Sequence, residues 1–386
     1  MTRKPKIWAY YYPSWHNDPR LGSSFYSEWD IVRSARPGFQ GHQQPRVPLW
    51  GYSDLSDRRE VLRQVTAAQA HGLAGFIICL YWDHGELVYD TPLWHLVSIC
   101  RKERFGLGVM WVNRRPHSAL PLAAKDMRDR GEEPIFRDRR VQSGRGTLRE
   151  LARFCCEEIW SPLGKDVCLS LEGRPALSIF SVEQLLDDLG EGVADEIGDL
   201  KEVTSQRVGS RAYLLGTVHR PTWWLGSAKQ LGFDGITSYV LLPEWDGQFV
   251  QFYERGAQRA EELWSSFEKD SNLPYVPSVC VGWDSSPRGK EEADGGNTIY
   301  PWSPIIVEDS PEAFERHLGN ASGFASDRGH SKVFVASWNE WSEGHYLEPD
   351  TERGCDMLAA VARVANRYPN ECHAAQSIGE NRGRRI

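Results

Sequence analysis

Residues 57–81 read DRREVLRQVTAAQAHGLAGFIICLY, a helical pattern followed directly by a short apolar run. Asp57 is a typical residue at a helix start, and Gly72 is typical of the position after a helix end. The apolar residues between them have helical spacing, at Val61, Leu62, Val65 and Ala68. Residues 75–81 are apolar without alternation, as in a parallel strand covered on both faces. This stretch predicts one helix-and-strand unit of an α/β fold.

Seven further apolar runs of similar length occur along the chain, separated by segments that often have helical periodicity. They are residues 7–12 (IWAYYY), 106–112 (GLGVMWV), 175–180 (PALSIF), 212–218 (AYLLGTV), 235–239 (GITSY), 275–281 (YVPSVCV) and 332–338 (KVFVASW). Eight strands alternating with helices predict a single-domain (β/α)8 TIM barrel over residues 1–373. A doubly wound open sheet is the competing fold. The polar tail, residues 374–386, is expected to be disordered.

Three long connections each follow a predicted strand: residues 11–57, 113–147 and 282–311. A barrel would place them at its C-terminal mouth, where barrel enzymes build their sites. Residues 114–149 hold ten Lys or Arg against five Asp or Glu. This stretch is either a solvated loop face or a contact for an anionic sugar group such as a uronate, sulfate or phosphate.

Composition narrows the class of protein. The net charge of -8 gives no indication of nucleic acid or an anionic membrane as partner. Sixteen Trp suit either core packing or the apolar faces of sugar rings. The eight Cys form no CxxC pair, which predicts reduced, buried thiols and no metal site. No apolar run could span a membrane, and no signal peptide follows Met1, so a cytoplasmic location is expected.

The strongest chemical signal is WNEWSEG at residues 338–344, which follows the last predicted strand. If the chain turns helically there, Glu340 and Glu343 have Cβ atoms about 5–6 Å apart. Glycoside cleavage needs two carboxyl groups that flank the scissile bond, about 5–5.5 Å apart in retaining enzymes. Burial beside Trp338 and Trp341 would keep one of them protonated. The competing interpretation is a surface turn with two solvated carboxylates.

Aromatic and polar residues also follow other predicted strands, and this repetition predicts a carbohydrate site at the barrel mouth. The competing interpretation is that alternate rings face the core. Phosphate-binding glycine loops and a DxD motif are absent from the sequence, and no cofactor is expected. The predicted substrate-binding residues are Tyr11, Tyr12, Trp15, His16, His42, Tyr81, Trp82, Trp111, Asn113, Arg114, Tyr239, Trp283, Asp284, Trp338, Asn339 and Trp341.

The sequence resembles the glycoside hydrolase family 99-like proteins, also called the WbsX family. The resembling stretches are YYPSWH (11–16), residues 25–52, HGLAGFIICLYW (71–82), MWVN (110–113), GWDSSPR (282–288) and SWNEWSEGHYLEPD (337–350). The resemblance implies a (β/α)8 barrel and a retaining, endo-acting α-mannosidase or mannanase that forms a 1,2-anhydro sugar. It implies that Glu340 is the base toward the sugar 2-hydroxyl and Glu343 the general acid, and that Tyr11, His16, Trp82 and Asn113 line the subsite of the cleaved sugar.

Two departures from such relatives leave the sugar open. The second strand has Ile77-Ile78-Cys79-Leu80 where relatives often carry an acidic residue, and Arg114 follows Asn113 where they carry His. A retaining glycoside hydrolase that cleaves an α-glycosidic bond in an oligo- or polysaccharide is the favoured function. A WbsX-type glycosyltransferase of polysaccharide assembly and a non-catalytic carbohydrate-binding barrel are the alternatives.

Overall fold

A computed structural model describes residues 4–18, 28–114, 143–289 and 293–366 of the chain. The main sheet runs in the order β10-β8-β7-β6-β4-β2-β1-β13-β11, and each ladder along this path is parallel. The strands of the path are β1 (Lys6–Tyr11), β2 (Leu73–Asp83), β4 (Gly106–Trp111), β6 (Arg174–Ile179), β7 (Tyr213–Val218), β8 (Gly235–Ser238), β10 (Tyr275–Val276), β11 (Ser278–Cys280) and β13 (Lys332–Ala336). Each of the eight predicted runs therefore contains a strand.

The barrel closes through the run of residues 275–280. β10 pairs with β8, β11 pairs with β13, and Pro277 alone separates β10 from β11. Pro277 has no N–H for a ladder, but its carbonyl accepts a hydrogen bond from Phe334 N of β13 at 2.9 Å. The two ends of the sheet path are thus consecutive parts of one strand. The predicted (β/α)8 barrel is confirmed.

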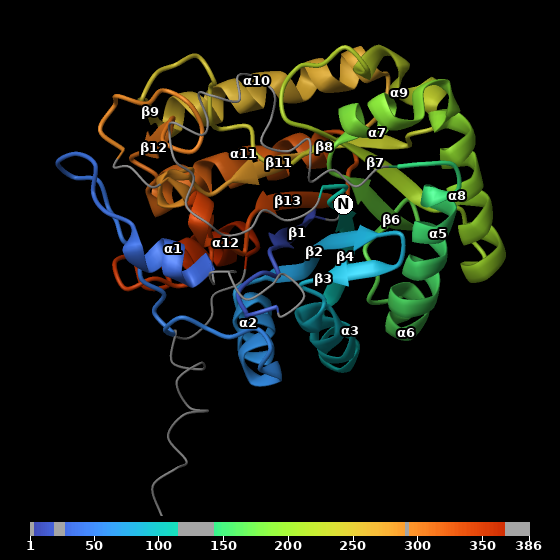
Figure 1. Ribbon diagram of the computed structural model, residues 1–386, viewed down its shortest axis with the longest axis horizontal. Helices are drawn as coiled ribbons and strands as arrows, with labels where there is room; N and C mark the ends of the chain where they lie inside the picture. The colour runs from blue at the N-terminus through green and yellow to red at the C-terminus, as the bar shows by residue number, and fades with distance from the viewer. Residues whose placement is uncertain (1–3, 19–27, 115–142, 290–292, 367–386) are drawn as a thin grey trace, which may run out of the picture.

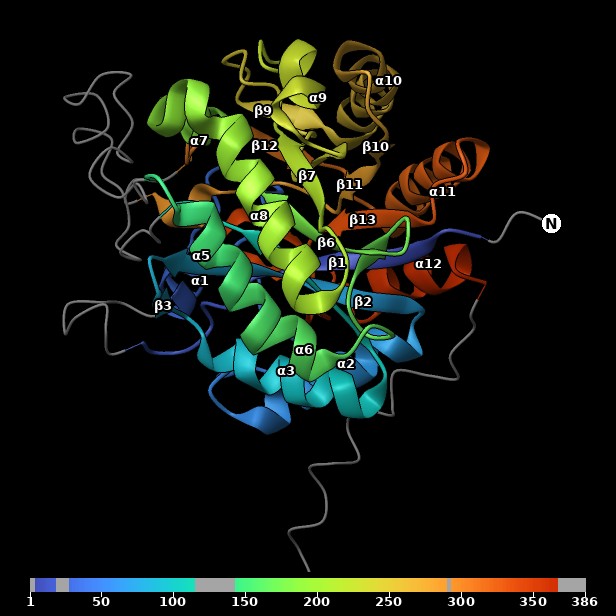
Figure 2. The same cartoon turned by 90° about the vertical axis from the view of Figure 1, so that its right-hand side faces the viewer.

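Helices surround the strands on the outside (Figures 1 and 2). The side chain of Asp57 accepts a hydrogen bond from Arg59 N and caps α2, as predicted. The α-helices are α1 (Glu28–Ser34), α2 (Arg58–Ala70), α3 (Thr91–Glu103), α5 (Thr147–Phe154), α6 (Ser161–Leu163), α7 (Val182–Leu189), α8 (Val193–Val208), α9 (Ala228–Leu231), α10 (Tyr253–Ser271), α11 (Pro311–Asp327) and α12 (Asp356–Val364).

Short elements decorate the connections after the strands. Those that matter for the site are the 3-10 helices η6 (Ser286–Arg288) and η7 (Trp341–Glu343) and the antiparallel pair β14 (Asn339–Glu340) and β15 (His345–Tyr346). The others are β3 (Glu86–Val88), β5 (Ser170–Leu171), β9 (Val250–Phe252), β12 (Ile305–Val307), the π-helix η3 (Cys155–Trp160) and the 3-10 helices η4 (Gly190–Gly192) and η5 (Leu225–Ser227).

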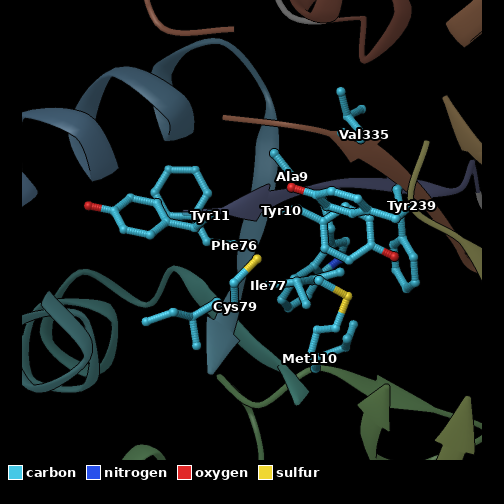
Figure 3. Close-up of a cluster of buried hydrophobic side chains, with 14 of the residues drawn as sticks. Ala9, Tyr10, Tyr11, Phe76, Ile77, Cys79, Met110, Tyr239 and Val335 are labelled. Carbon is cyan, nitrogen blue, oxygen red and sulfur yellow. The ribbon is translucent and has the colours of Figure 1, made fainter. Parts of the chain in front are cut away.

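Side chains of β1 alternate between the barrel interior and the layer under the helices, because successive strand residues point to opposite faces. Tyr10 packs edge-on against Tyr239 with ring centroids 4.9 Å apart, whereas Tyr11 packs against Phe76 at 5.0 Å. Figure 3 shows the two pairs on opposite sides of the strand. The Tyr11 hydroxyl donates to Gln64 of α2 at 2.7 Å. Tyr11 therefore lies outside the barrel, between β1 and α2.

Six cysteines are free and buried, as predicted: Cys79, Cys100, Cys155, Cys156, Cys168 and Cys280. Cys355 is half-buried at the start of α12 and is disulfide-bonded, so the prediction of a reduced thiol is wrong there. Among the described residues, no helix has the length and apolar character needed to cross a bilayer. The tail 374–386 and most of the basic stretch 114–149 lie outside the described residues.

Candidate active site

The two glutamates predicted as the acid pair lie on a tight turn that follows β13 at the C-terminal end of the barrel. Glu340 lies opposite His345 in the short β14–β15 ladder, and Glu343 ends η7 between these strands. Gly344 closes the turn at φ 68°. A Cβ at position 344 would lie 2.8 Å from the backbone nitrogen of Asp284, so both the left-handed conformation and the close approach require glycine.

One guanidinium bridges the two glutamates. Arg288 donates from Nη2 to Glu340 Oε1 at 3.0 Å and from Nη1 to Glu343 Oε1. It also donates from Nε and Nη2 to Ser342 Oγ, at 3.1 and 2.8 Å. The side chains of Glu340 and Glu343 are 4% and 14% exposed. Because both carboxylates bond one planar group, they face the same space and could act on one substrate bond.

A third carboxyl group reaches the same cation. Glu28, the first residue of α1, lies with Oε1 3.6 Å from Nη2 of Arg288. Its oxygens accept hydrogen bonds from the Tyr12 hydroxyl at 3.1 Å and the Ser14 hydroxyl at 2.8 Å. Two buried carboxyl groups and that of half-buried Glu343 therefore share one guanidinium. Like charges so placed disfavour simultaneous ionisation, so the cluster tends to retain a proton.

Two further side chains hold Glu343. The Tyr300 hydroxyl donates to Oε1 at 3.1 Å and accepts from Nη1 of Arg288 at 2.9 Å. Nε2 of His345 lies 3.3 Å from Oε2. Burial lowers the pKa of His345, which keeps this imidazole neutral and makes it a hydrogen-bond donor to the carboxylate. Glu343 is thus surrounded by donors that favour its ionised form.

The environments of the pair push the two pKa values apart. Burial raises the pKa of Glu340 well above its ordinary value, and the charges of Glu343 and Glu28 act in the same direction. Burial alone would also raise the pKa of Glu343, but Arg288, His345 and Tyr300 outweigh it and lower the pKa to about 2. These surroundings favour the proton of the pair on Glu340 over Glu343. This is the reverse of the roles that the family resemblance implies.

Four of the predicted aromatic residues lie around the pair. Burial raises the pKa of the phenols of Tyr12, Tyr81 and Tyr239, and a charge on Glu340 would raise it further. Trp283 stacks on the His345 ring at 5.6 Å with an interplanar angle of 11°. Tyr239 meets the same imidazole edge-on at 5.5 Å. Trp283 and Tyr239 thus pack around the imidazole that bonds Glu343.

His42 and Asp284 lie beside the turn of the acid pair but make a self-contained cluster. Asp284 accepts from His42 Nε2 at 2.8 Å and Gln44 at 2.6 Å through one oxygen, and from Ser286 through the other. Burial alone would raise the pKa of Asp284, but these donors hold it well below its ordinary value. The backbone N–H of Asp284 donates to Glu343 O at 2.8 Å. The cluster therefore positions the turn.

Two predicted asparagines clamp neighbouring chain segments. The amide of Asn339 accepts from Tyr12 N at 2.8 Å and donates to Tyr12 O at 2.9 Å, so it joins the ends of β1 and β13. Asn113 makes the same double contact with the backbone of Ser181, at 2.9 and 2.8 Å. Both amides are engaged with protein groups. Asn113 and Asn339 therefore hold neighbouring chain segments together.

Three predicted residues lie in the layer between the barrel and the helices. Tyr11 bonds Gln64, and Trp338 packs on Phe76 with centroids 5.1 Å apart. Trp341 donates its indole N–H to Glu348 at 2.8 Å. Burial raises the pKa of Glu348 to about 7. The contacts of these three residues support the acid-pair turn from behind.

The remaining predicted residues are packed among protein groups at the strand ends. Trp15 donates to Asn339 O at 2.7 Å, and Trp111 donates to Trp82 O at 3.0 Å. His16 is buried and lies 3.0 Å from Pro13 O. The guanidinium of Arg114 lies over the Phe180 ring at 5.5 Å. None of these contacts is with the acid pair.

Sequence reasoning missed the residues that set the charge of the pair, Glu28, Arg288, Tyr300, Ser342 and His345. Arg288 and Glu28 lie within stretches that carry the family resemblance, and a lone Arg after the seventh strand is the one signal that could have indicated a counter-charge. Across the part of the chain that the structure describes, no three His, Cys, Asp or Glu side chains are grouped to hold a metal ion.

Comparison with protein-family models matches residues 7–119 and 168–361 to the family described as glycosyltransferase WbsX. Two curated relatives, both called uncharacterized protein WxcX, come from two strains of Xanthomonas campestris pv. campestris. Each is 25% identical to this chain over 386 residues, which covers 94% of this chain and 50% of the relative. The chain thus spans about half the length of the curated relatives it matches.

Solved structures share the barrel. A glycoside hydrolase family 99 endo-alpha-mannosidase from Bacteroides thetaiotaomicron aligns with a TM-score of 0.60 at 13% identity, over 93% of this chain and 96% of that one. A glycoside hydrolase-like protein aligns with a TM-score of 0.60 at 14% identity, over 94% of this chain and 95% of that one. At these identities the likeness concerns the fold.

Proposed function

The chain belongs to the glycosyltransferase WbsX family, and from that premise we propose that it is a retaining glycoside hydrolase that cleaves an α-glycosidic bond in an oligo- or polysaccharide. The observation that carries the proposal is the bridging of Glu340 and Glu343 by Arg288 at the C-terminal end of a barrel. Paired carboxyl groups with separated pKa values are what glycoside cleavage requires. The barrel shared with a family 99 endo-alpha-mannosidase supports the same class of substrate bond.

We propose that cleavage proceeds through the sugar 2-hydroxyl. Its oxygen attacks the anomeric carbon as the bond to the leaving oxygen breaks, which gives a 1,2-anhydro sugar. Glu340 donates its proton to the leaving oxygen, and Glu343 takes the proton of the 2-hydroxyl. Water then attacks the anomeric carbon and opens the anhydro ring. Glu340 takes the proton of that water, and Glu343 returns its proton to the 2-oxygen.

The two acid roles follow the proton order of the unliganded pair, since a general acid must hold its proton at the working pH. The resemblance implies the opposite order, with Glu340 as base and Glu343 as acid. Leaving groups distinguish the two assignments. A variant that lacks the general acid should retain activity on aryl glycosides with acidic leaving groups, because these need no proton to depart.

The test is turnover of a panel of α-linked oligosaccharides by the wild-type chain, Glu340→Gln and Glu343→Gln. We expect reducing sugar from the wild type and a loss on the order of 10²- to 10⁴-fold in both variants. Glu352→Gln, which changes an exposed carboxyl on a later turn, should stay at wild-type rate. Near-full activity in either pair variant would contradict the proposal. Retained activity of Glu343→Gln alone on aryl glycosides would restore the roles implied by the resemblance.

A second candidate function is sugar transfer, which the description of the matching family favours. The same acid pair would serve, with a sugar hydroxyl as acceptor in place of water. Reaction mixtures with and without an activated sugar donor separate the two functions. Product that forms only with the donor would assign transfer, and binding without any turnover would assign a carbohydrate-binding barrel.

An anionic substituent on the substrate is proposed at Arg114. Its guanidinium lies beside Phe180 and donates to Ser181 Oγ at 3.4 Å. The cation nearest the acid pair, Arg288, is already shared among three carboxyl groups. An anion would therefore be bound away from the cleaved sugar. Uronate-bearing members of the oligosaccharide panel test this position.

A further inference from the structure

Trp245 is an exposed tryptophan beside the acid-pair cluster, and we propose that it is the stacking platform of an outer sugar subsite. It lies on the connection after β8 and is 54% exposed. Exposure alone does not mark a binding site, because single apolar side chains are common on protein surfaces. The Trp245 ring also packs against Tyr300 of the acid-pair cluster, and this contact singles it out. The inference rests on the proposed function only in taking the ligand to be a glycan.

Two ring contacts join Trp245 to the surroundings of Glu343. The Trp245 ring meets Trp283 at 85° with centroids 5.9 Å apart, and Trp283 stacks on His345. The Trp245 ring also packs against the Tyr300 ring, with centroids 6.4 Å apart. Tyr300 and His345 both hydrogen-bond Glu343, at 3.1 and 3.3 Å. Trp245 therefore contacts Tyr300, one of the groups that hold the carboxylate, and is separated from the other, His345, by the ring of Trp283.

The loop that carries Trp245 is fixed on both sides of the indole. The side-chain amide of Gln251 accepts from Glu244 N at 2.9 Å and donates to Glu244 O at 2.6 Å. It also donates to Asp246 Oδ1 at 3.2 Å, and the same oxygen accepts from Gln248 N at 3.0 Å. Both chain neighbours of Trp245 are thus held in place. A platform that is ordered before binding loses little entropy when a ligand arrives.

The surroundings of the indole suit a sugar better than a second protein. A pyranose has an apolar C–H face for the ring and hydroxyl groups around its edge. Exposed Asp246 adjoins the indole and its carboxylate can accept hydrogen bonds from hydroxyls, whereas the neighbouring Glu244 is paired with Arg259 at 2.8 Å. Continuity with the acid pair through Tyr300 and Trp283 points to the same glycan chain. The substrate then extends beyond the two sugars joined by the cleaved bond.

The test compares disaccharides and pentasaccharides of α-linked mannose, glucose, galactose and rhamnose, with binding measured by calorimetry and turnover by reducing-sugar release. Trp245→Ala should weaken binding of the bound pentasaccharide by about tenfold, which corresponds to roughly 1.4 kcal/mol, and leave the disaccharide unchanged. Trp245→Phe, which retains a ring, should fall between. Trp223→Ala removes a tryptophan that is 73% exposed after β7 and is the matched control.

Each outcome decides the subsite separately from the proposed function. Equal effects of Trp245→Ala on short and long glycans, no effect on either, or failure of the wild type to bind any member would overturn the subsite. Length-dependent binding without turnover would keep the subsite and remove the hydrolase. Turnover that does not depend on position 245 would keep the hydrolase and remove the subsite.

Discussion

A single carboxyl group, Asp284, and a cluster of three carboxyl groups meet at the acid-pair turn, where Asp284 N donates to Glu343 O, and they are built in opposite ways. Asp284 uses both oxygens to accept four hydrogen bonds, from Ser286, His42 and Gln44. In the other cluster, Glu28, Glu340 and Glu343 share one cation, Arg288. The pKa of Asp284 is lowered and that of Glu340 is raised.

The difference teaches how to tell a structural carboxylate from a chemical one. A buried charge whose donors match its acceptors is stable in one protonation state, and it can only hold its neighbours in place. Where carboxyl groups outnumber cations, one of them keeps a proton that it can give away. The carboxylates differ in partners more than in depth, because Asp284 and Glu340 are both buried.

The largest effect should come from removing the shared cation. Arg288→Gln leaves two buried carboxyl groups and that of half-buried Glu343 without a counter-charge, so we expect a loss of about 3–5 kcal/mol in the free energy of unfolding at neutral pH. The loss should shrink as pH falls, because protonation removes the uncompensated charges. Urea unfolding between mildly acidic and neutral pH measures it. Arg288→Lys, which keeps the charge without the fork, should recover part of the stability. A loss that does not change with pH would contradict this account.

A smaller effect is expected in the balanced cluster. Asp284→Asn leaves donors from His42 and Gln44 poorly matched, which should cost about 1–3 kcal/mol. The folded-state pKa of Asp284 lies below its unfolded value of about 3.9, so its contribution is present above that pH and is lost as pH falls through the lowered pKa. As pH falls, the stability of the Arg288→Gln variant should therefore recover first. The difference in stability between Asp284→Asn and wild type should close only at lower pH. Recovery of both variants over one pH range would remove the contrast.

The smallest effect on stability should follow the same carboxyl-to-amide change at Glu340. Glu340→Gln replaces a group that is already neutral, and we expect a change within about 1 kcal/mol near pH 5. The folded-state pKa of Glu340 is raised, so the wild type loses stability as pH rises from the unfolded value toward the folded one. The variant should therefore gain relative to wild type with rising pH. A destabilisation as large as that of Asp284→Asn would show that Glu340 is ionised in the resting chain.

The barrel could be predicted because its signal is repeated. Eight apolar runs each became a strand, and the unit at residues 57–81 appears as α2 and β2. The interruption at Pro277 was not anticipated, since a proline inside an apolar run does not reveal which neighbour each half will pair with. Cys355 was misjudged because the absence of a CxxC spacing does not exclude a disulfide.

The site was only partly accessible from sequence. Position at a strand end placed Tyr12, Tyr81 and Tyr239 near Glu340, but it also selected Tyr11, which faces α2. One residue of register decides which face of the barrel a ring occupies. The cation, Arg288, comes from a different connection, and its distance to the pair depends on folding. The sequence alone could therefore not predict that Arg288 supplies the counter-charge of the acid pair.

Gly344 has a consequence for how such chains can diversify. Its backbone conformation and its approach to Asp284 leave no room for a side chain, although no atom of Gly344 takes part in the proposed chemistry. Saturation mutagenesis under selection for activity should recover glycine at position 344 as strictly as it recovers glutamate at positions 340 and 343. An invariant position among related chains can therefore mark a steric requirement, as at Gly344, as well as a reactive group.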